Sequence, residues 1–240
     1  MTTVNVLAKL TMAAAASVTA LGVAGSAQAL SITIGAPGDP GSGDCAPFGC
    51  VLRYQQVYDA SLFSSPILID TISFFNQNFQ PGSISAATYT INFSTTTKAV
   101  NALSSTFADN IGANNQSFFV GSLSGAITNG KFSITGNNFL YDPSQGNLLL
   151  DISKDAGSFD FSVFLDSQNG SAPSGTISRV YSFDNSPSGI TNDNYGLVTE
   201  FSFNTQSVPE PTSIIGLLGL GAFGVTSVCK RKQQQAAVKA

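Results

Sequence analysis

Carboxylate, Lys, Tyr and hydroxyl groups are what this 240-residue chain offers for catalysis, because it contains no histidine. Lack of histidine excludes every Ser-His-Asp and Cys-His mechanism and every imidazole metal site. Glycoside hydrolysis by two carboxylates stays open. The carboxylates that could form such a pair are Asp151, Asp155, Asp160, Asp166 and Glu200. Exposed Asp is ordinarily a solvated strand or loop residue, and we predict that the protein is not an enzyme.

Two loops rich in Asp and Asn could hold a hard cation. Asp142, Asn147 and Asp151 flank one tight turn, and Asp184 and Asp193 lie in another loop. Ca²⁺ prefers carboxylate and carbonyl oxygens from such loops. The EF-hand spacing is missing, however, and Asx turns explain these residues without a metal. We therefore expect no cofactor, and keep Ca²⁺ at the first loop as the alternative.

The chain contains three cysteines, Cys45, Cys50 and Cys229. In an exported protein, the spacing of Cys45 and Cys50 permits a local disulfide that closes a small loop. We predict that bond, with two free thiols as the alternative. Cys229 lies at the far end of an apolar segment and is expected to stay reduced.

Residues 1–29 have the pattern of a signal peptide. One basic residue, Lys9, precedes an apolar run, and Ala27 and Ala29 form the A-x-A pattern that signal peptidase reads. We predict cleavage after Ala29, with an N-terminal membrane anchor as the alternative. The run is shorter than the ~20 residues that a membrane span needs.

The C-terminal segment has the features of a temporary membrane anchor. A linker (205–211) ends in Pro209, Glu210 and Pro211, and an uncharged segment follows from residue 212 to 229. As a helix those residues would rise about 27 Å, close to one hydrocarbon core. The basic residues of the tail (230–240) predict a cytoplasmic C-terminus, since such residues stay inside. They are Lys230, Arg231 and Lys232, followed by Lys239 near the end.

This order of signal peptide, Pro-Glu-Pro, glycine-rich span and basic cluster resembles the PEP-CTERM sorting signal of Gram-negative bacteria and cyanobacteria. The resemblance implies an exosortase, a membrane enzyme that acts near the tripeptide, as partner. It also implies an inner-membrane-anchored precursor that reaches the cell surface or extracellular matrix. The tail after Lys232 is longer than the pattern requires. A plain tail anchor with a Pro-Glu-Pro linker is the alternative.

Residues 30–204 read as one all-β domain. Hydrophobic residues alternate with polar ones in short runs, as at Tyr89, Ile91 and Phe93. Turn signals such as Asn129-Gly130 separate the runs. We predict a two-sheet antiparallel β-sandwich, jelly-roll-like, of about ten strands. The predicted strands are 30–34, 51–58, 67–75, 89–93, 116–123, 132–134, 148–153, 159–165, 177–183 and 199–203, with one short helix or loop at 100–111.

Three segments of this domain resemble the exported domains of other PEP-CTERM proteins: 53–58, 141–151 and 178–181. The resemblance brings no agreed biochemical function. Between residues 30 and 208 the chain has five basic and 13 acidic residues, a formal net charge of −8. Such a surface repels nucleic acid, which we exclude as a partner.

Two classes of function remain. The first is a structural or adhesive surface protein associated with exopolysaccharide. The second is a carbohydrate-active enzyme or lectin-like module on the same sorting route. Sugar binding commonly uses aromatic platforms, and without Trp the candidates are Tyr54, Tyr58, Tyr141, Tyr181 and Tyr195. Core packing explains most of these, so we expect the first class.

Overall fold

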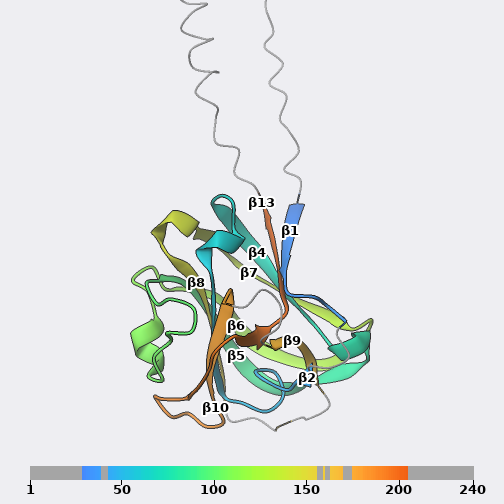
Figure 1. The fold of residues 1–240 in the computed structure, drawn as a ribbon. Coiled ribbons are helices and arrows are strands. Elements are labelled where there is room, and N and C mark those ends of the chain that lie inside the picture. Colours follow the sequence, from blue (N-terminus) through green and yellow to red (C-terminus); the bar gives the residue numbers. More distant parts are fainter. Residues whose placement is uncertain (1–28, 39–42, 156–158, 160–162, 170–174, 205–240) are drawn as a thin grey trace, which may run out of the picture.

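The computed structural model describes residues 29–38, 43–155, 159, 163–169 and 175–204. These residues form antiparallel strands and four short 3₁₀ segments (Figure 1). The 3₁₀ segments are η1 (Ala60–Leu62), η2 (Gln77–Phe79), η3 (Phe107–Asn110) and η4 (Pro143–Gln145). The strands are β1 (Ala29–Ile34), β2 (Gly43–Asp44), β3 (Arg53–Tyr58), β4 (Ile67–Phe75), β5 (Gly82–Thr96), β6 (Gln116–Ile127), β7 (Lys131–Tyr141), β8 (Asn147–Lys154), β9 (Leu165–Asn169), β10 (Ile177–Ser182), β11 (Ile190–Asn192), β12 (Tyr195–Leu197) and β13 (Thr199–Asn204).

The strands form three sheets in the described part of the chain. A four-stranded sheet has the order β1-β13-β4-β7, and a six-stranded sheet has the order β11-β10-β3-β8-β5-β6. A small third sheet, β12-β9-β2, is built from short strands. Strands that follow one another in the chain often lie in different sheets: β3, β5 and β8 in the six-stranded sheet, β4 and β7 in the four-stranded one. The all-β, antiparallel prediction is therefore confirmed.

Aromatic side chains from the two large sheets meet in the core. Phe201 of β13 is fully buried, and its ring centroid lies 5.0 Å from that of Tyr58 on β3 and 6.1 Å from that of Phe93 on β5. Phe93 also stacks on Phe139 of β7 at 5.6 Å. The inner faces of the two large sheets therefore pack against each other across one hydrophobic core.

The polar–apolar alternation places most strands correctly. The predicted strand 67–75 matches β4, and the predicted strands 30–34, 51–58, 148–153, 177–183 and 199–203 overlap β1, β3, β8, β10 and β13. In the segment 100–111, only the short η3 is helical. The turn Asn129-Gly130 joins β6 to β7, and both residues have positive φ. A Cβ on Gly130 would lie 2.1 Å from Cα of Phe79, so this position accepts only glycine.

Several boundaries differ from the sequence prediction. β5 runs from Gly82 to Thr96 and not only over 89–93, because its first residues pair with the end of β6. β7 extends beyond the predicted 132–134 to Tyr141. In the predicted strand 159–165, residues 160–162 lie outside the described part, and β9 begins only at Leu165. Val163 and Leu165 are buried, but Phe159 is 45% exposed and rests beside the ammonium group of Lys154. The alternation therefore did not place Phe159 in the core.

Both ends of the described chain leave the same end of the sandwich (Figure 1). β1 and β13 are antiparallel neighbours, and Ala29 lies opposite Asn204. No helix among the described residues is long and apolar enough to cross a membrane. The predicted span (212–229), the linker, the basic tail and nearly all of the signal peptide lie outside the described residues. Ala29, the last residue of that predicted peptide, is the first residue of β1.

Replacing Phe201 by Ala is expected to lower the free energy of unfolding by about 3–5 kcal/mol, the usual cost of truncating a buried Phe. The ring contacts strands of both large sheets, so its loss leaves a cavity in the centre of the core. Phe164→Ala is the matched control, since Phe164 is 47% exposed; it should cost less than about 1 kcal/mol. Urea unfolding followed by tyrosine fluorescence measures both. Equal losses would contradict the core position of Phe201.

Candidate functional site

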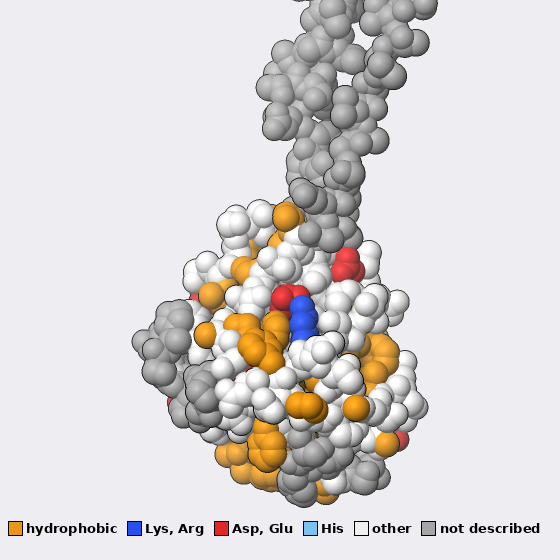
Figure 2. Space-filling model, turned by 90° about the vertical axis from the view of Figure 1, so that its right-hand side faces the viewer, with side chains coloured by type: hydrophobic (Ala, Val, Ile, Leu, Met, Phe, Trp, Pro, Cys, Tyr) orange, Lys and Arg blue, Asp and Glu red, His pale blue; other side chains and the backbone are white. Residues whose placement is uncertain are grey.

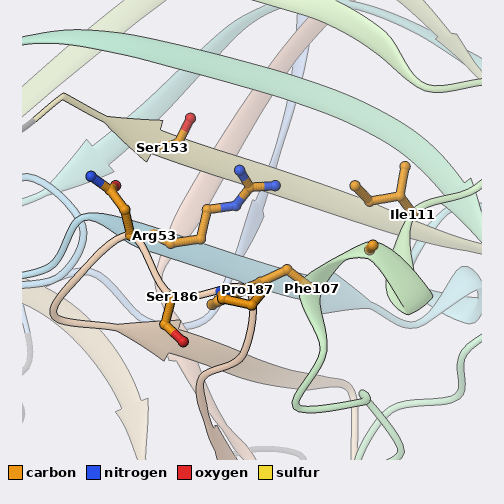
Figure 3. A pocket seen from close by; sticks show the side chains of 8 residues that line it. Arg53, Phe107, Ile111, Ser153, Ser186 and Pro187 are labelled. Atoms are coloured by element: carbon orange, nitrogen blue, oxygen red, sulfur yellow. The ribbon is translucent and has the colours of Figure 1, made fainter.

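A pocket of about 260 Å³ lies on the outer face of the six-stranded sheet (Figure 3). Its floor is formed by Arg53 of β3 and Ser153 of β8, which are direct partners in the sheet register. Successive side chains of a strand point to opposite faces of the sheet. Arg53 and Ser153 therefore point away from the core, while Tyr54, the next residue on β3, is buried in it. Hence the sheet supplies the polar base of the pocket.

Two loops form the walls of this pocket. One carries Phe107, Ala108 and Ile111, and the other is the β10–β11 connection with Ser186 and Pro187. The loops are tied together by a backbone hydrogen bond in which the Phe107 N–H donates to the Pro187 carbonyl at 3.1 Å. Val57, Leu149 and Val180 on the outer sheet face bury the underside of the first loop through Leu103 and Phe107. This second hydrophobic cluster holds the wall on the sheet.

Buried amide groups fix the first loop to the sheet. The Nε2 of Gln55 donates to the Phe107 carbonyl at 3.1 Å, and the Nδ2 of Asn110 donates to Oε1 of Gln55 at 2.9 Å. Both side chains are fully buried. On the second loop, the Ser186 N–H donates to Oδ1 of Asp184 at 2.9 Å. The pocket walls are therefore held by hydrogen bonds as well as by packing.

An ion pair lies at the base of the pocket. The Nη2 of Arg53 is 2.5 Å from Oδ2 of Asp151, and the side chains are 28% and 3% exposed. Burial raises the pKa of Asp151 above its ordinary value, and the neighbouring Arg53 opposes that rise only in part. The guanidinium also lies 5.4 Å from the centroid of the Phe107 ring. Arg53 is thus held by an acid and by an aromatic face, while its side chain as a whole is 28% exposed and lines the pocket.

The calcium candidates do not converge on one site. Asp142 caps η4 by accepting the Ser144 N–H at 2.9 Å. The Oδ1 of Asn147 accepts the Ala60 N–H at 2.9 Å, and its Nδ2 donates to the Lys98 carbonyl. Asp151 lies four residues along β8 from Asn147, roughly 13 Å away at the strand rise, and pairs with Arg53. The alternative of Ca²⁺ at these three residues gains no support from this geometry, because each residue has its own protein partner.

The carboxylates considered for glycoside hydrolysis are also dispersed. Asp155 accepts the Thr88 N–H at 2.9 Å, and Asp166 accepts the Gly38 N–H at 2.6 Å. Glu200 pairs with Lys131 at 2.6 Å on the outer face of the four-stranded sheet. Asp160 lies outside the described residues. Among the described carboxylates, these residues hold separate parts of the backbone and surface.

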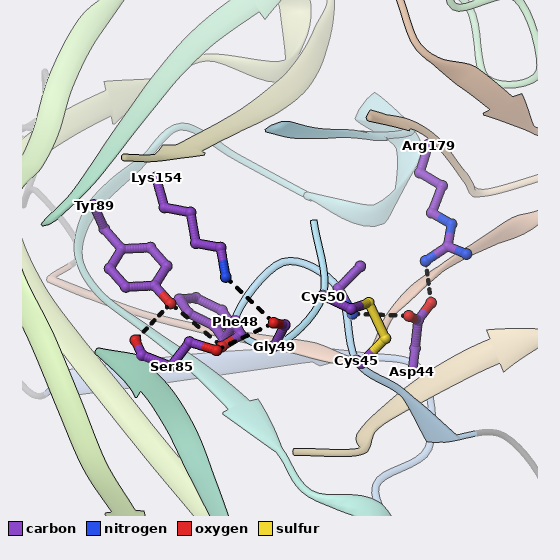
Figure 4. The surroundings of a disulfide bond; sticks show 10 residues. Asp44, Cys45, Phe48, Gly49, Cys50, Ser85, Tyr89, Lys154 and Arg179 are labelled. Atoms are coloured by element: carbon purple, nitrogen blue, oxygen red, sulfur yellow. Dashed lines mark hydrogen bonds and ion pairs between the residues drawn. A yellow bond between two sulfur atoms is a disulfide. The ribbon is translucent and has the colours of Figure 1, made fainter. Parts of the chain in front are cut away.

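Cys45 and Cys50 are joined in a disulfide with Cα atoms 5.3 Å apart (Figure 4). The two sulfurs and the carboxylate of Asp44 lie close enough to suggest a metal site. Metal binding by Cys requires thiolates, and the disulfide consumes both sulfurs. The carboxylate is engaged as well, since Asp44 accepts the Ala46 N–H at 2.9 Å and pairs with Arg179. This cluster therefore serves structure.

Arg179 forms the most buried ion pair in the described residues, with Asp44. Its guanidinium carbon lies 4.1 Å from the ring centroid of Tyr195, 4.7 Å from that of Tyr181 and 5.9 Å from that of Tyr54. The hydrogen-bonded acid and the three rings compensate for the desolvation of the cation. Arg179, on the inner side of β10, thereby fastens the third sheet through Asp44 of β2 and Tyr195 of β12.

The tyrosines expected as sugar platforms are mostly core residues. Tyr54, Tyr58 and Tyr141 are fully buried, and burial raises the pKa of each phenol above its ordinary value. Tyr181 and Tyr195 are partly exposed and stack on Arg179. Sequence reasoning missed the roles of Arg53 and Arg179. The only available signal was their rarity, as two of the five basic residues between positions 30 and 208.

The sorting residues Pro209, Glu210 and Pro211 and the basic residues Lys230, Arg231 and Lys232 lie outside the described residues. They begin a few positions after β13, which ends at Asn204. Residues 207–232 match the family model of the PEP-CTERM protein-sorting motif. The match covers all six of these residues. No curated protein and no solved structure matches the chain.

The matched motif identifies the class of sequence at the end of this chain. PEP-CTERM signals are recognised by exosortase, a membrane enzyme, and mark exported proteins that are processed at the membrane. The chain carries such a signal, as its sequence pattern predicts. The match says nothing about residues 1–206.

Replacing Asp44 by Ala is expected to lower the free energy of unfolding by about 3–5 kcal/mol, because Arg179 would remain buried without its acid. Glu200→Ala is the matched control, since it breaks the more exposed pair with Lys131; it should cost less than about 1 kcal/mol. Urea unfolding of both variants under oxidising conditions measures the difference. A loss for Asp44→Ala no larger than that for Glu200→Ala would contradict a buried anchoring role.

The pH dependence of stability should show the raised pKa of Asp151. The folded protein retains this proton at pH values at which the unfolded chain has released it, so ionising Asp151 favours unfolding. Relative to Asp151→Asn, the wild type is expected to lose stability as the pH rises from 3.8, the ordinary value, through the raised pKa. Urea unfolding of both proteins between about pH 3.5 and pH 7 gives this difference. If the free energy of unfolding of the wild type instead rises relative to that of Asp151→Asn as the pH rises, attraction to Arg53 outweighs burial.

Proposed function

We propose that this chain is an exported surface protein with a structural or adhesive role in the extracellular polysaccharide layer, and that it is not an enzyme. The observation that carries the proposal is the PEP-CTERM motif at residues 207–232, directly behind the last strand of a β domain. Sorting of an exported protein through exosortase is what this motif indicates. The adhesive role is our inference from the domain in front of it.

The architecture supports a domain displayed on a single stalk. β1 and β13 are neighbours, so the domain is attached at one end (Figure 1). Residues 205–211 reach about 25 Å when fully extended, so a membrane span at 212–229 would hold this end close to the membrane. Cleavage near Pro209–Pro211 would leave β13 intact, since at least four residues separate the strand from the motif.

The surface supports binding more than turnover. Figure 2 shows a face on which hydrophobic side chains are scattered among uncharged polar ones, with few charges. The described carboxylates that could have formed a hydrolytic pair are dispersed and hold backbone or cationic partners. Successive strands often lie in different, facing sheets, which supports placing the domain among jelly rolls. Capsid and lectin domains share this architecture. A lectin-like module on the same route is the second candidate, and the Arg53 pocket favours it.

Glu210→Ala is expected to block processing, because the carboxylate between the two prolines is the one charged group of the tripeptide. The variant should keep residues 212–240 and stay in the membrane fraction, whereas the wild type should lose them. Intact mass spectrometry of both proteins, expressed in a host that contains an exosortase, measures this. Gln206→Ala, four residues earlier in the same linker, is the matched control and should be processed normally. A wild-type protein that retains residues 212–240 in such a host would refute the proposed sorting route.

A further inference from the structure

We propose that the pocket between Arg53, Phe107 and Pro187 binds one uncharged sugar ring of a polysaccharide. This inference rests on the adhesive role proposed above and gives it a site and a ligand class. The pocket lies on the outer face of the six-stranded sheet (Figure 3). Strand β10, whose Ser182 pairs with Arg53, lies away from the end at which the chain enters and leaves the domain (Figure 1). A ligand there would not interfere with the sorting segment.

The polar groups of the pocket match the hydroxyls of a sugar. Arg53 lines the pocket with a side chain that is 28% exposed, and a guanidinium can donate hydrogen bonds. The hydroxyls of Ser153 and Ser186 can donate or accept them. Asn185 adds an amide at the rim. These groups come from β3, β8 and the β10–β11 loop, so they surround the space from different sides, as Figure 3 shows for the labelled side chains.

The apolar wall matches the C–H face of a pyranose. Phe107 and Ile111 of the first loop and Pro187 of the second loop give the pocket its apolar surface, with the exposed Ala108 beside them. Pockets that bind small ligands combine a mostly apolar lining with a few placed polar groups. Carbohydrates need both, because a sugar ring presents hydroxyls at its edge and C–H groups on its faces.

Charge argues for a neutral sugar. Asp151 already compensates Arg53 at 2.5 Å, so the pocket has no net positive charge to attract a carboxylate or sulfate. The surrounding domain carries a formal net charge of −8 and repels polyanions. Arg53 therefore acts as a fixed hydrogen-bond donor and not as an anion receptor.

Size and rigidity argue for one ring. The volume of about 260 Å³ is below the ~300–1,000 Å³ of pockets for drug-sized ligands. Arg53 is held in advance by Asp151 and by the Phe107 ring, and the wall is held by Gln55 and Asn110. Little side-chain freedom is lost on binding, which favours measurable affinity from few contacts.

Isothermal titration of the full-length protein in detergent, with neutral and acidic oligosaccharides, tests this proposal. The probes are oligomers of glucose, galactose and mannose, and oligogalacturonate as the acidic comparison. We expect at least one neutral oligomer to bind in the millimolar to micromolar range, and oligogalacturonate to bind at least about tenfold more weakly. Failure of all neutral probes, or stronger binding of the acidic one, overturns the proposal.

Ala108→Trp places a large side chain at the opening of the pocket without removing a buried group, since Ala108 is exposed. It should weaken binding at least about tenfold. Ala126→Trp, at an exposed position of β6, is the matched control and should bind as the wild type does. Arg53→Gln should also weaken binding, with urea unfolding checking that the protein still folds. Equal affinities for Ala108→Trp and the wild type overturn the assignment of the pocket.

The outcome separates this inference from the sorting proposal. Ala108→Trp should be processed after the Pro-Glu-Pro motif like the wild type, because residue 108 lies in the wall of the pocket and not near β13. Loss of sugar binding with normal processing supports both proposals. If the wild type is processed normally but binds no sugar, only the proposal of a sugar-binding pocket is refuted.

Discussion

Insertion of β13 between β1 and β4 is the constraint on which the rest of the structure depends. This last strand is hydrogen-bonded on both sides and places Phe201 where the aromatic residues of the two large sheets meet. The four-stranded sheet is therefore complete only when residue 204 is in place. The same pairing sets the first and last described residues opposite each other. The position of a C-terminal sorting signal relative to the domain thus follows from the pairing of one strand.

Two arginines, Arg179 and Arg53, are each held by an acid and by aromatic rings, but they differ in exposure. Arg179 is buried against Asp44 and tyrosine rings, and it fastens the third sheet to the sandwich beside the Cys45–Cys50 loop. Arg53 is paired with Asp151 and the Phe107 ring, but its side chain is 28% exposed and lines a pocket. The buried Arg179 can only stabilise the fold, whereas Arg53 is held in place but reaches the pocket and can also contact a ligand. This difference in exposure is why the pocket, and not the Arg179 cluster, carries the proposed binding site.

The surface loops are built mainly from short polar side chains that hydrogen-bond to nearby backbone. Asp142, Asp155 and Asp184 each accept a backbone N–H. A loop stabilised in this way uses its acids internally and leaves few of them to act together on a substrate or a cation. The role of these acids in loop structure agrees with the structural role proposed above.

Sequence alone determined the sorting signal and the class of fold. Pro-Glu-Pro, the apolar segment and the basic cluster are contiguous, so their order can be read without a structure, and residues 207–232 match the motif. Alternation of hydrophobic residues is equally local, and it located β3, β4, β8, β10 and β13. Tertiary structure decided which distant side chains meet. Arg53 and Asp151 are 98 positions apart, and Arg179 and Asp44 are 135 apart; periodicity gives the face of a strand but not its neighbour in the sheet. For the same physical reason, the structure does not bring the three calcium candidates together, because Asn147 and Asp151 are close in sequence but lie far apart along an extended strand.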